Sequence, residues 1–124
     1  MHKLFLLSGA ILGCLGVAIG AFGAHKLKPF LELSNRVGTF ETGVQYQFYH
    51  AIALILIGII AEKIEHPAIN YAGYAMLTGT IVFSFSLYIL CLTGITKFGA
   101  VTPIGGFLLI IGWLSLAIAV FKKI

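Results

Sequence analysis

Residues 4–24 read LFLLSGAILGCLGVAIGAFGA, a run without a single charged side chain. About 20 apolar residues in a helix are enough to cross the roughly 30 Å hydrocarbon core of a bilayer. Three more neutral runs follow along the chain, at 42–61, 66–96 and 98–121. Each is long enough to span, so the sequence predicts four transmembrane helices, at about 4–24, 42–61, 71–94 and 103–121.

The composition supports the same prediction. Of 124 residues, 60% are hydrophobic and only 10% carry a charge, and the mean hydropathy is +1.05. A soluble domain carries about a quarter charged residues, because so much of a small domain faces water. These values exclude a soluble enzyme or a DNA-binding domain. The net charge of +4 comes from scattered residues rather than from the basic cluster that nucleic acid requires.

Four spans put both chain ends on one side of the membrane, side A, and connectors 25–41 and 95–102 on the opposite side, side B. We therefore predict an all-α fold, a four-helix transmembrane bundle threaded up-down-up-down as a single integral membrane domain over residues 1–124. The first span is expected to stay uncleaved, because its apolar run continues ten residues past Cys14, where a lipoprotein-type cleavage would fall.

The first connector has a helical pattern of its own. Apolar residues recur at helical spacing from Leu27 onward, and polar residues fill the opposite face. Pro29 suits a first helical turn, and Glu32 with Arg36 forms an i,i+4 pair. The pattern over 27–41 predicts an amphipathic helix lying along the side B interface. The alternative is that this segment simply extends the second span into water.

Glycines recur through the first span at spacings of 4, 3, 4 and 3 residues. Lipid gives helices no hydrophobic gain on association, so close backbone approach through small residues takes its place. We therefore predict a helix-packing seam, with Gly105 and Gly112 of the fourth span as a counterpart face, although another copy of the chain could also face the seam. The seam consists of Gly9, Gly13, Gly16, Gly20 and Gly23.

Polar side chains within the spans gather in the side B half. His50, with Tyr46 one turn before it, lies about 12 Å below Thr42 at 1.5 Å per residue, and an imidazole at that depth needs a partner. Antiparallel threading brings polar residues of the other spans into the same half, with Thr102–Pro103 read as the start of the fourth. The predicted pocket comprises His25, Glu41, Tyr46, Gln47, His50, Ser86, Tyr88 and Thr102. The alternative is that these residues only join helices by hydrogen bonds.

The sequence shows no nucleophile with a partner base, no carboxylate pair and no phosphate-binding loop. We therefore predict no catalytic residue and no cofactor. Cys14 and Cys91 lie in apolar runs, where thiols act as small hydrophobic groups. A metal site at His25 and His50 lacks a third ligand, so no metal is predicted.

Several blocks of the chain carry a family resemblance: GAFGAH at 20–25, Thr42–Gly43 with Tyr46–Gln47 and His50, Ser86–Leu87–Tyr88, VTPIGG at 101–106, and Gly112–Trp113. Together they resemble the YgdD/YwdK-type family of small integral membrane proteins, a bacterial family with eukaryotic relatives. The chain departs from the family pattern at Lys26 and Phe85. The resemblance implies a four-span protein of the plasma membrane and no assigned activity.

Orientation depends on the resemblance alone, because the basic residues do not decide it. Side A carries Lys3, Lys63, Lys122 and Lys123, and side B carries Lys26, Lys28, Arg36 and Lys97. Family members often have more basic second connectors and C-termini, which favours cytoplasmic termini.

The leading functional hypothesis is a non-enzymatic membrane protein that binds a partner or small ligand at the polar pocket. The alternative is a transporter or channel subunit that uses His50 and Glu41. A lipid- or quinone-modifying enzyme is a third class. The expected partners are the lipid bilayer and, left open, a homo-oligomer or larger membrane complex, with no role for nucleic acid.

Overall fold

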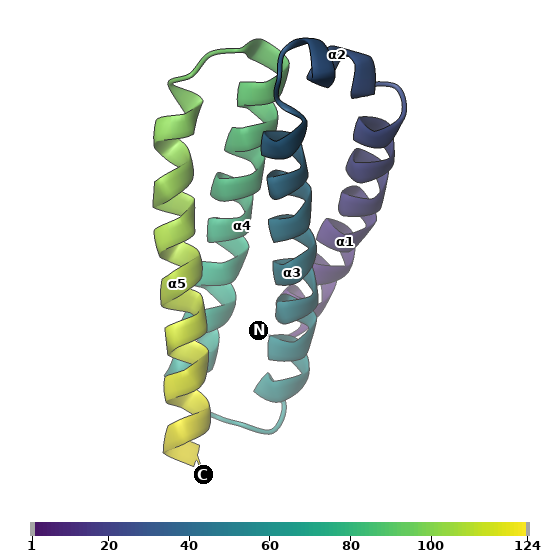
Figure 1. Cartoon of the computed structure of the whole chain (residues 1–124). Helices are drawn as coiled ribbons and strands as arrows, with labels where there is room; N and C mark the ends of the chain where they lie inside the picture. Colours follow the sequence, from purple (N-terminus) through teal and green to yellow (C-terminus); the bar gives the residue numbers. More distant parts are fainter. Residues whose placement is uncertain (1, 124) are drawn as a thin grey trace.

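The computed structural model describes residues 2–123, which form five helices (Figure 1). Four of them are long and apolar enough to cross a membrane: α1 (His2–Ala24), α3 (Val37–Ala61), α4 (Pro67–Thr93) and α5 (Phe98–Lys123). The fifth, α2 (Lys28–Leu33), is short and lies across one end of the long helices (Figure 1). The predicted all-α class, with four candidate spans and a further helix between the first and second, is confirmed.

The long helices begin earlier than the predicted spans. α4 starts at Pro67, which needs no amide partner in a first helical turn, and His66 caps it by accepting a 3.0 Å hydrogen bond from the Ala68 amide at its Nδ1. α5 starts at Phe98, so Pro103 lies inside the helix and does not open it. Charge-free runs mark the part of a helix that meets lipid, whereas caps and prolines set where the helix begins.

The segment 27–41 divides between the two predicted alternatives. Residues 28–33 form α2 across one end of the long helices, whereas residues 37–41 already belong to α3. Asn35 separates the two helices with a φ of 58°, in the left-handed region that asparagine tolerates better than most residues. A separate helix therefore exists in this segment but is shorter than the amphipathic pattern indicated.

The long helices pack in the order α1, α3, α4, α5, with α1 and α5 at opposite ends of the row (Figure 1). The glycines show how closely they approach. A Cβ added at Gly9 would lie 2.7 Å from the carbonyl oxygen of Ala51 on α3. One added at Gly112 would lie 2.6 Å from Met76 on α4. The idea that the glycines of α1 and α5 face each other is therefore wrong, because periodicity reveals which face is small but not which helix it meets.

Four of the five seam glycines face α3. Gly16, Gly20 and Gly23 lie against Phe48, Val44 and Phe40 in turn, as Gly9 lies against Ala51. Gly13 is different, since nothing lies within 4 Å of a Cβ added there.

Phe5 ties the first turns of α1 to α4 as well. Its side chain is fully buried, and it fills the space that the missing side chain of Gly73 leaves on α4. The Phe5 ring meets the Tyr74 ring edge-on, with centroids 5.3 Å apart. His2 lies 3.5 Å from Glu62, which places the start of α1 beside the end of α3. α3 and α4 are thus the inner helices on which the rest of the chain packs.

These contacts predict that Gly9→Leu will lower the free energy of unfolding by about 1–3 kcal/mol, because the new side chain would push α1 off the α3 backbone. Gly13→Leu is the matched control, with the same change on the same helix in open space. Reversible unfolding of both variants in mixed micelles measures the difference. Equal stability of the two variants would contradict the packing of α1 on α3.

Candidate functional site

Gln47 joins three helices at the centre of the protein. Its side chain is fully buried. Its Nε2 donates a 2.8 Å hydrogen bond to the carbonyl oxygen of Leu12 on α1, and its Oε1 accepts a 2.6 Å bond from the Tyr88 hydroxyl on α4. Nearby, the Ser84 hydroxyl donates to the carbonyl oxygen of Gly43 at 2.7 Å. The polar groups of Gln47, Tyr88 and Ser84 are therefore used in holding α1, α3 and α4 together.

His50 lies on another side of α3 and links it to α5. Its Nδ1 is 2.7 Å from the carbonyl oxygen of Tyr46, and its Nε2 is 3.0 Å from the indole nitrogen of Trp113. A carbonyl oxygen can only accept, so Nδ1 carries the proton, and Nε2 then accepts the indole N–H. This assignment makes the imidazole neutral and gives both of its nitrogens a partner.

A groove of about 710 Å³ runs between α3 and α5 beside this pair. Phe83 of α4 contributes to its lining, and the Tyr46 ring stacks on the Phe83 ring with centroids 4.5 Å apart and planes 19° from parallel. Phe107 is 64% and Trp113 47% exposed, so these two aromatic side chains are open to the outside of the helix bundle. The aromatic residues lining it are Tyr46, Tyr49, Phe83, Phe107 and Trp113.

Ser86 and Thr102 form a separate link between α4 and α5. Their hydroxyl oxygens are 2.6 Å apart, and the Ser86 side chain is nearly buried. Ser86 also approaches the carbonyl oxygen of Phe83 at 2.8 Å. This contact joins two helices near their side B ends.

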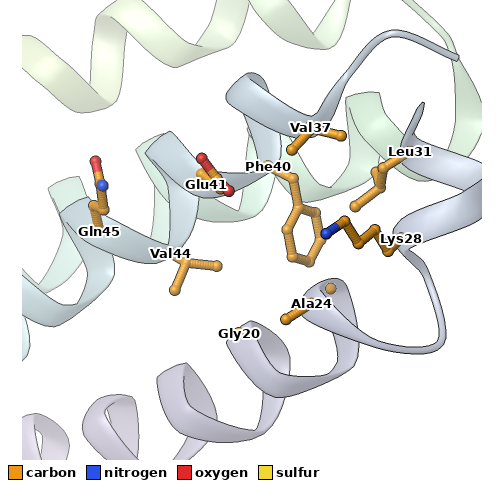
Figure 2. Close-up of a pocket in the computed structure, with 10 residues that line it drawn as sticks. Gly20, Ala24, Lys28, Leu31, Val37, Phe40, Glu41, Val44 and Gln45 are labelled. Carbon is orange, nitrogen blue, oxygen red and sulfur yellow. The ribbon is translucent and has the colours of Figure 1, made fainter.

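His25 and Glu41 both lie at the side B end and are exposed. His25 is in the turn after α1. Glu41 lines a second pocket of about 200 Å³ between α1, α2 and α3, and Figure 2 shows it there with Lys28 and Gln45. Within residues 2–123, no group of three or more His, Cys, Asp or Glu side chains converges as a metal site would require.

The structure thus distributes the eight predicted pocket residues over four places. Gln47 and Tyr88 lie in the three-helix core. Tyr46 and His50 line the aromatic groove. Ser86 and Thr102 form the link between α4 and α5. His25 and Glu41 lie on the exposed rim at the side B end.

Three further residues take part in these contacts, although none of them was among the predicted pocket residues: Trp113, Phe83 and Ser84. Two signals drew attention to Trp113, because it is the only tryptophan of the chain and it stands in the Gly112–Trp113 block of the family resemblance, but neither predicted its partner. Its bond to His50 joins residues 63 positions apart. Hydrophobic periodicity cannot predict such a pairing, because it depends on how α3 and α5 rotate against α4.

The hydrogen bond between Gln47 and Tyr88 should couple the effects that replacing these two residues has on the free energy of unfolding. Gln47→Leu and Tyr88→Phe each remove the bond between the two side chains, so the double variant should be more stable than the sum of the single losses indicates. We expect a coupling free energy of about 0.5–1.7 kcal/mol, the range found between membrane helices. Unfolding in mixed micelles measures it, with Thr78→Val as an exposed control on α4. Strict additivity would show that the bond between Gln47 and Tyr88 contributes nothing.

Comparison with known proteins identifies the family. The family described as "Protein of unknown function (DUF423)" matches residues 19–106. A UPF0382 membrane protein of Staphylococcus haemolyticus is 46% identical over 121 residues, which cover 97% of each chain. The UPF0382 membrane protein YwdK of Bacillus subtilis is 40% identical over 121 residues, covering 97% of this chain and 98% of its own. No solved structure matches the chain. The chain therefore belongs to the DUF423 family of UPF0382 membrane proteins, which confirms the YwdK-type resemblance.

Proposed function

We propose that the protein binds one membrane amphiphile by holding its acyl or isoprenyl chain in the aromatic groove between α3 and α5. The observation that carries this proposal is the groove itself, about 710 Å³ of space lined by five aromatic side chains on helices apolar enough to span a bilayer. Ligand sites typically combine 300–1,000 Å³ of apolar lining with a few polar groups. A ligand would reach such a groove sideways, from lipid.

Part of the groove lining is held in place before a ligand arrives. The bond from Trp113 to His50 holds α5 against α3, and the stack of Tyr46 on Phe83 fixes the α4 side. Side chains held in this way lose little conformational entropy when a ligand binds. A preformed groove therefore favours specific binding over the transient contacts that any helix surface makes with lipid.

Two tyrosine hydroxyls of the groove lining would orient the amphiphile. Among the described residues, neither the Tyr46 nor the Tyr49 hydroxyl has a hydrogen-bond partner. Tyr46 precedes His50 on α3 by about one helical turn, so its backbone lies closer to side B. The headgroup would accordingly point toward side B, with its chain running toward Trp113.

Binding accounts for these contacts better than proton passage does. Both nitrogens of His50 are bonded, and Gln47 and Tyr88 bond each other inside the core. Glu41 lies on the exposed rim. A transporter that uses His50 and Glu41 would have to break the link between α3 and α5 at every cycle, whereas a binding protein keeps it.

We also propose in which membrane the protein resides and how it is oriented there. Relatives are named membrane proteins of bacteria, and we place this protein in the plasma membrane with both termini in the cytoplasm. Sides A and B carry equal numbers of basic residues, so these residues do not decide the orientation. Its support is the family resemblance, because family members often have more basic second connectors and C-termini. A topology reporter fused to the C-terminus tests it, and activity on the outer side would reverse it.

Trp113 allows groove occupancy to be measured directly, because it is the only tryptophan. In vesicles with traces of a brominated phospholipid or a brominated polyprenyl lipid, quenching should saturate at a low mole fraction of whichever lipid binds. Gly106→Leu should weaken that binding about tenfold, since a Cβ there has room, 3.7 Å from Phe83, and the longer side chain fills the groove.

Gly13→Leu is the matched control, on α1 and away from the groove. The lipid that quenches with saturation identifies the chain as acyl or isoprenyl. Quenching that rises in proportion to mole fraction for both lipids, equally in Gly106→Leu, would show that Trp113 meets only bulk lipid and would refute the proposal.

A further inference from the structure

The pocket between α1, α2 and α3 has a wall of small residues on α1 (Figure 2). That wall consists of Gly20, Gly23 and Ala24, and the volume of the pocket is about 200 Å³. A Cβ added at Gly20 would lie 3.2 Å from Val44, so α1 stays small where it meets α3. Ala24 is exposed, and a longer side chain at this position would occupy the pocket. The small residues of α1 therefore leave a space between the helices that a ligand can enter.

Two opposite charges and an amide line the other walls of this pocket. Lys28 lies on α2, whereas Glu41 and Gln45 lie on α3, one helical turn apart. Figure 2 shows the Lys28 side chain extending from α2 toward the ring of Phe40. Lys28 and Glu41 do not form an ion pair with each other, and within residues 2–123 neither they nor the Gln45 amide have another partner. The pocket therefore presents a cation, a carboxylate and an amide that are all available to a ligand.

The polar groups on α3 lie at two depths. At 1.5 Å per residue, α3 is about 38 Å long against about 30 Å of hydrocarbon, so about 4 Å extends at each end of a centred helix. Glu41 lies about 6 Å along α3 and is therefore near the boundary, and Gln45 lies about 6 Å deeper. A phospholipid has the same order, because its charged headgroup lies at the boundary and its ester carbonyl oxygens come next, before the chains.

We propose that this pocket binds the headgroup of a phospholipid that carries a primary ammonium, as phosphatidylethanolamine does. The lipid phosphate lies at the Lys28 ammonium, and the lipid ammonium lies at the Glu41 carboxylate. Only two carbons and an oxygen separate these groups of the lipid, so both fit one pocket whose charges come from different helices. One turn deeper, the Gln45 amide donates to an ester carbonyl oxygen. The pocket shares no lining residue with the aromatic groove, so what binds here does not depend on the proposed function.

The two opposite charges select this headgroup over those of other phospholipids. An anionic headgroup without an amine would pair with Lys28 but would bring like charge to Glu41. A trimethylammonium has no N–H to donate, whereas a primary ammonium donates charge-assisted hydrogen bonds to a carboxylate. Free phosphoethanolamine carries the same two charges, but it has no ester oxygen for Gln45 and no chain to extend into lipid. A membrane lipid therefore satisfies more of the pocket than a soluble ligand does.

The test identifies the lipid that the full chain retains. The protein is placed in nanodiscs of equal parts phosphatidylcholine, phosphatidylethanolamine and phosphatidylglycerol, and native mass spectrometry detects the lipid that stays bound after release. Wild type should retain phosphatidylethanolamine over the other two lipids. Ala24→Leu should weaken that retention about tenfold, because the longer side chain fills the pocket. Ala21→Leu is the matched control, with the same change at another exposed position of α1 that does not line the pocket.

A charge reversal tests which group meets which charge. Glu41→Lys should shift the preference from phosphatidylethanolamine to phosphatidylglycerol, because the pocket would then hold two cations. A purely structural role of Glu41 would not exchange one lipid for another. Ala24→Leu should leave the quenching of Trp113 by brominated lipid unchanged, which separates this pocket from the aromatic groove.

Three results would overturn the proposal: equal retention of the three lipids by wild type, equal losses in Ala24→Leu and Ala21→Leu, or a Glu41→Lys variant that still prefers phosphatidylethanolamine. Free phosphoethanolamine added to the nanodiscs should not displace the lipid. Displacement would assign the pocket to a soluble ligand and would likewise overturn the assignment to a lipid.

Discussion

The absence of water between membrane helices is the constraint on which this structure depends. A polar side chain there must find its partner within the protein, and among the described residues no buried side-chain nitrogen or oxygen is left without one. Gln47 shows the consequence most fully, because one amide bonds to α1 on one side and to α4 on the other. Glycines let the backbones come close enough for these short side chains to reach.

That constraint also decides what remains available for function. The deepest polar groups are already used as links between helices, with Gln47 and Tyr88 in the core and His50 on the link to α5. The aromatic groove between α3 and α5 remains open to the outside of the helices. A groove in this position suits the proposed ligand, which would arrive through the membrane plane, in keeping with a family whose members are named membrane proteins.

The sequence predicted the four spans and the polar side B half, because charges are scarce and threading is antiparallel. It could not predict where each polar residue points. Tyr46 and Gln47 are neighbours in the chain, yet one lines the groove and the other lies in the core. One residue turns a helix by about 100°, so small rotations of α3 decide between the two. The bond from Trp113 to His50 could not be predicted for the same reason, since it depends on how α5 lies against α4.

The most direct test of the claim that polar groups inside the membrane link the helices is nitrogen NMR of His50 and of the Trp113 indole in lipid. The single tryptophan gives one indole signal. The indole N–H should exchange slowly with water and His50 should be neutral and protonated at Nδ1, with both signals changing when either residue is replaced. A rapidly exchanging indole N–H, or an imidazole protonated at Nε2 instead, would contradict it.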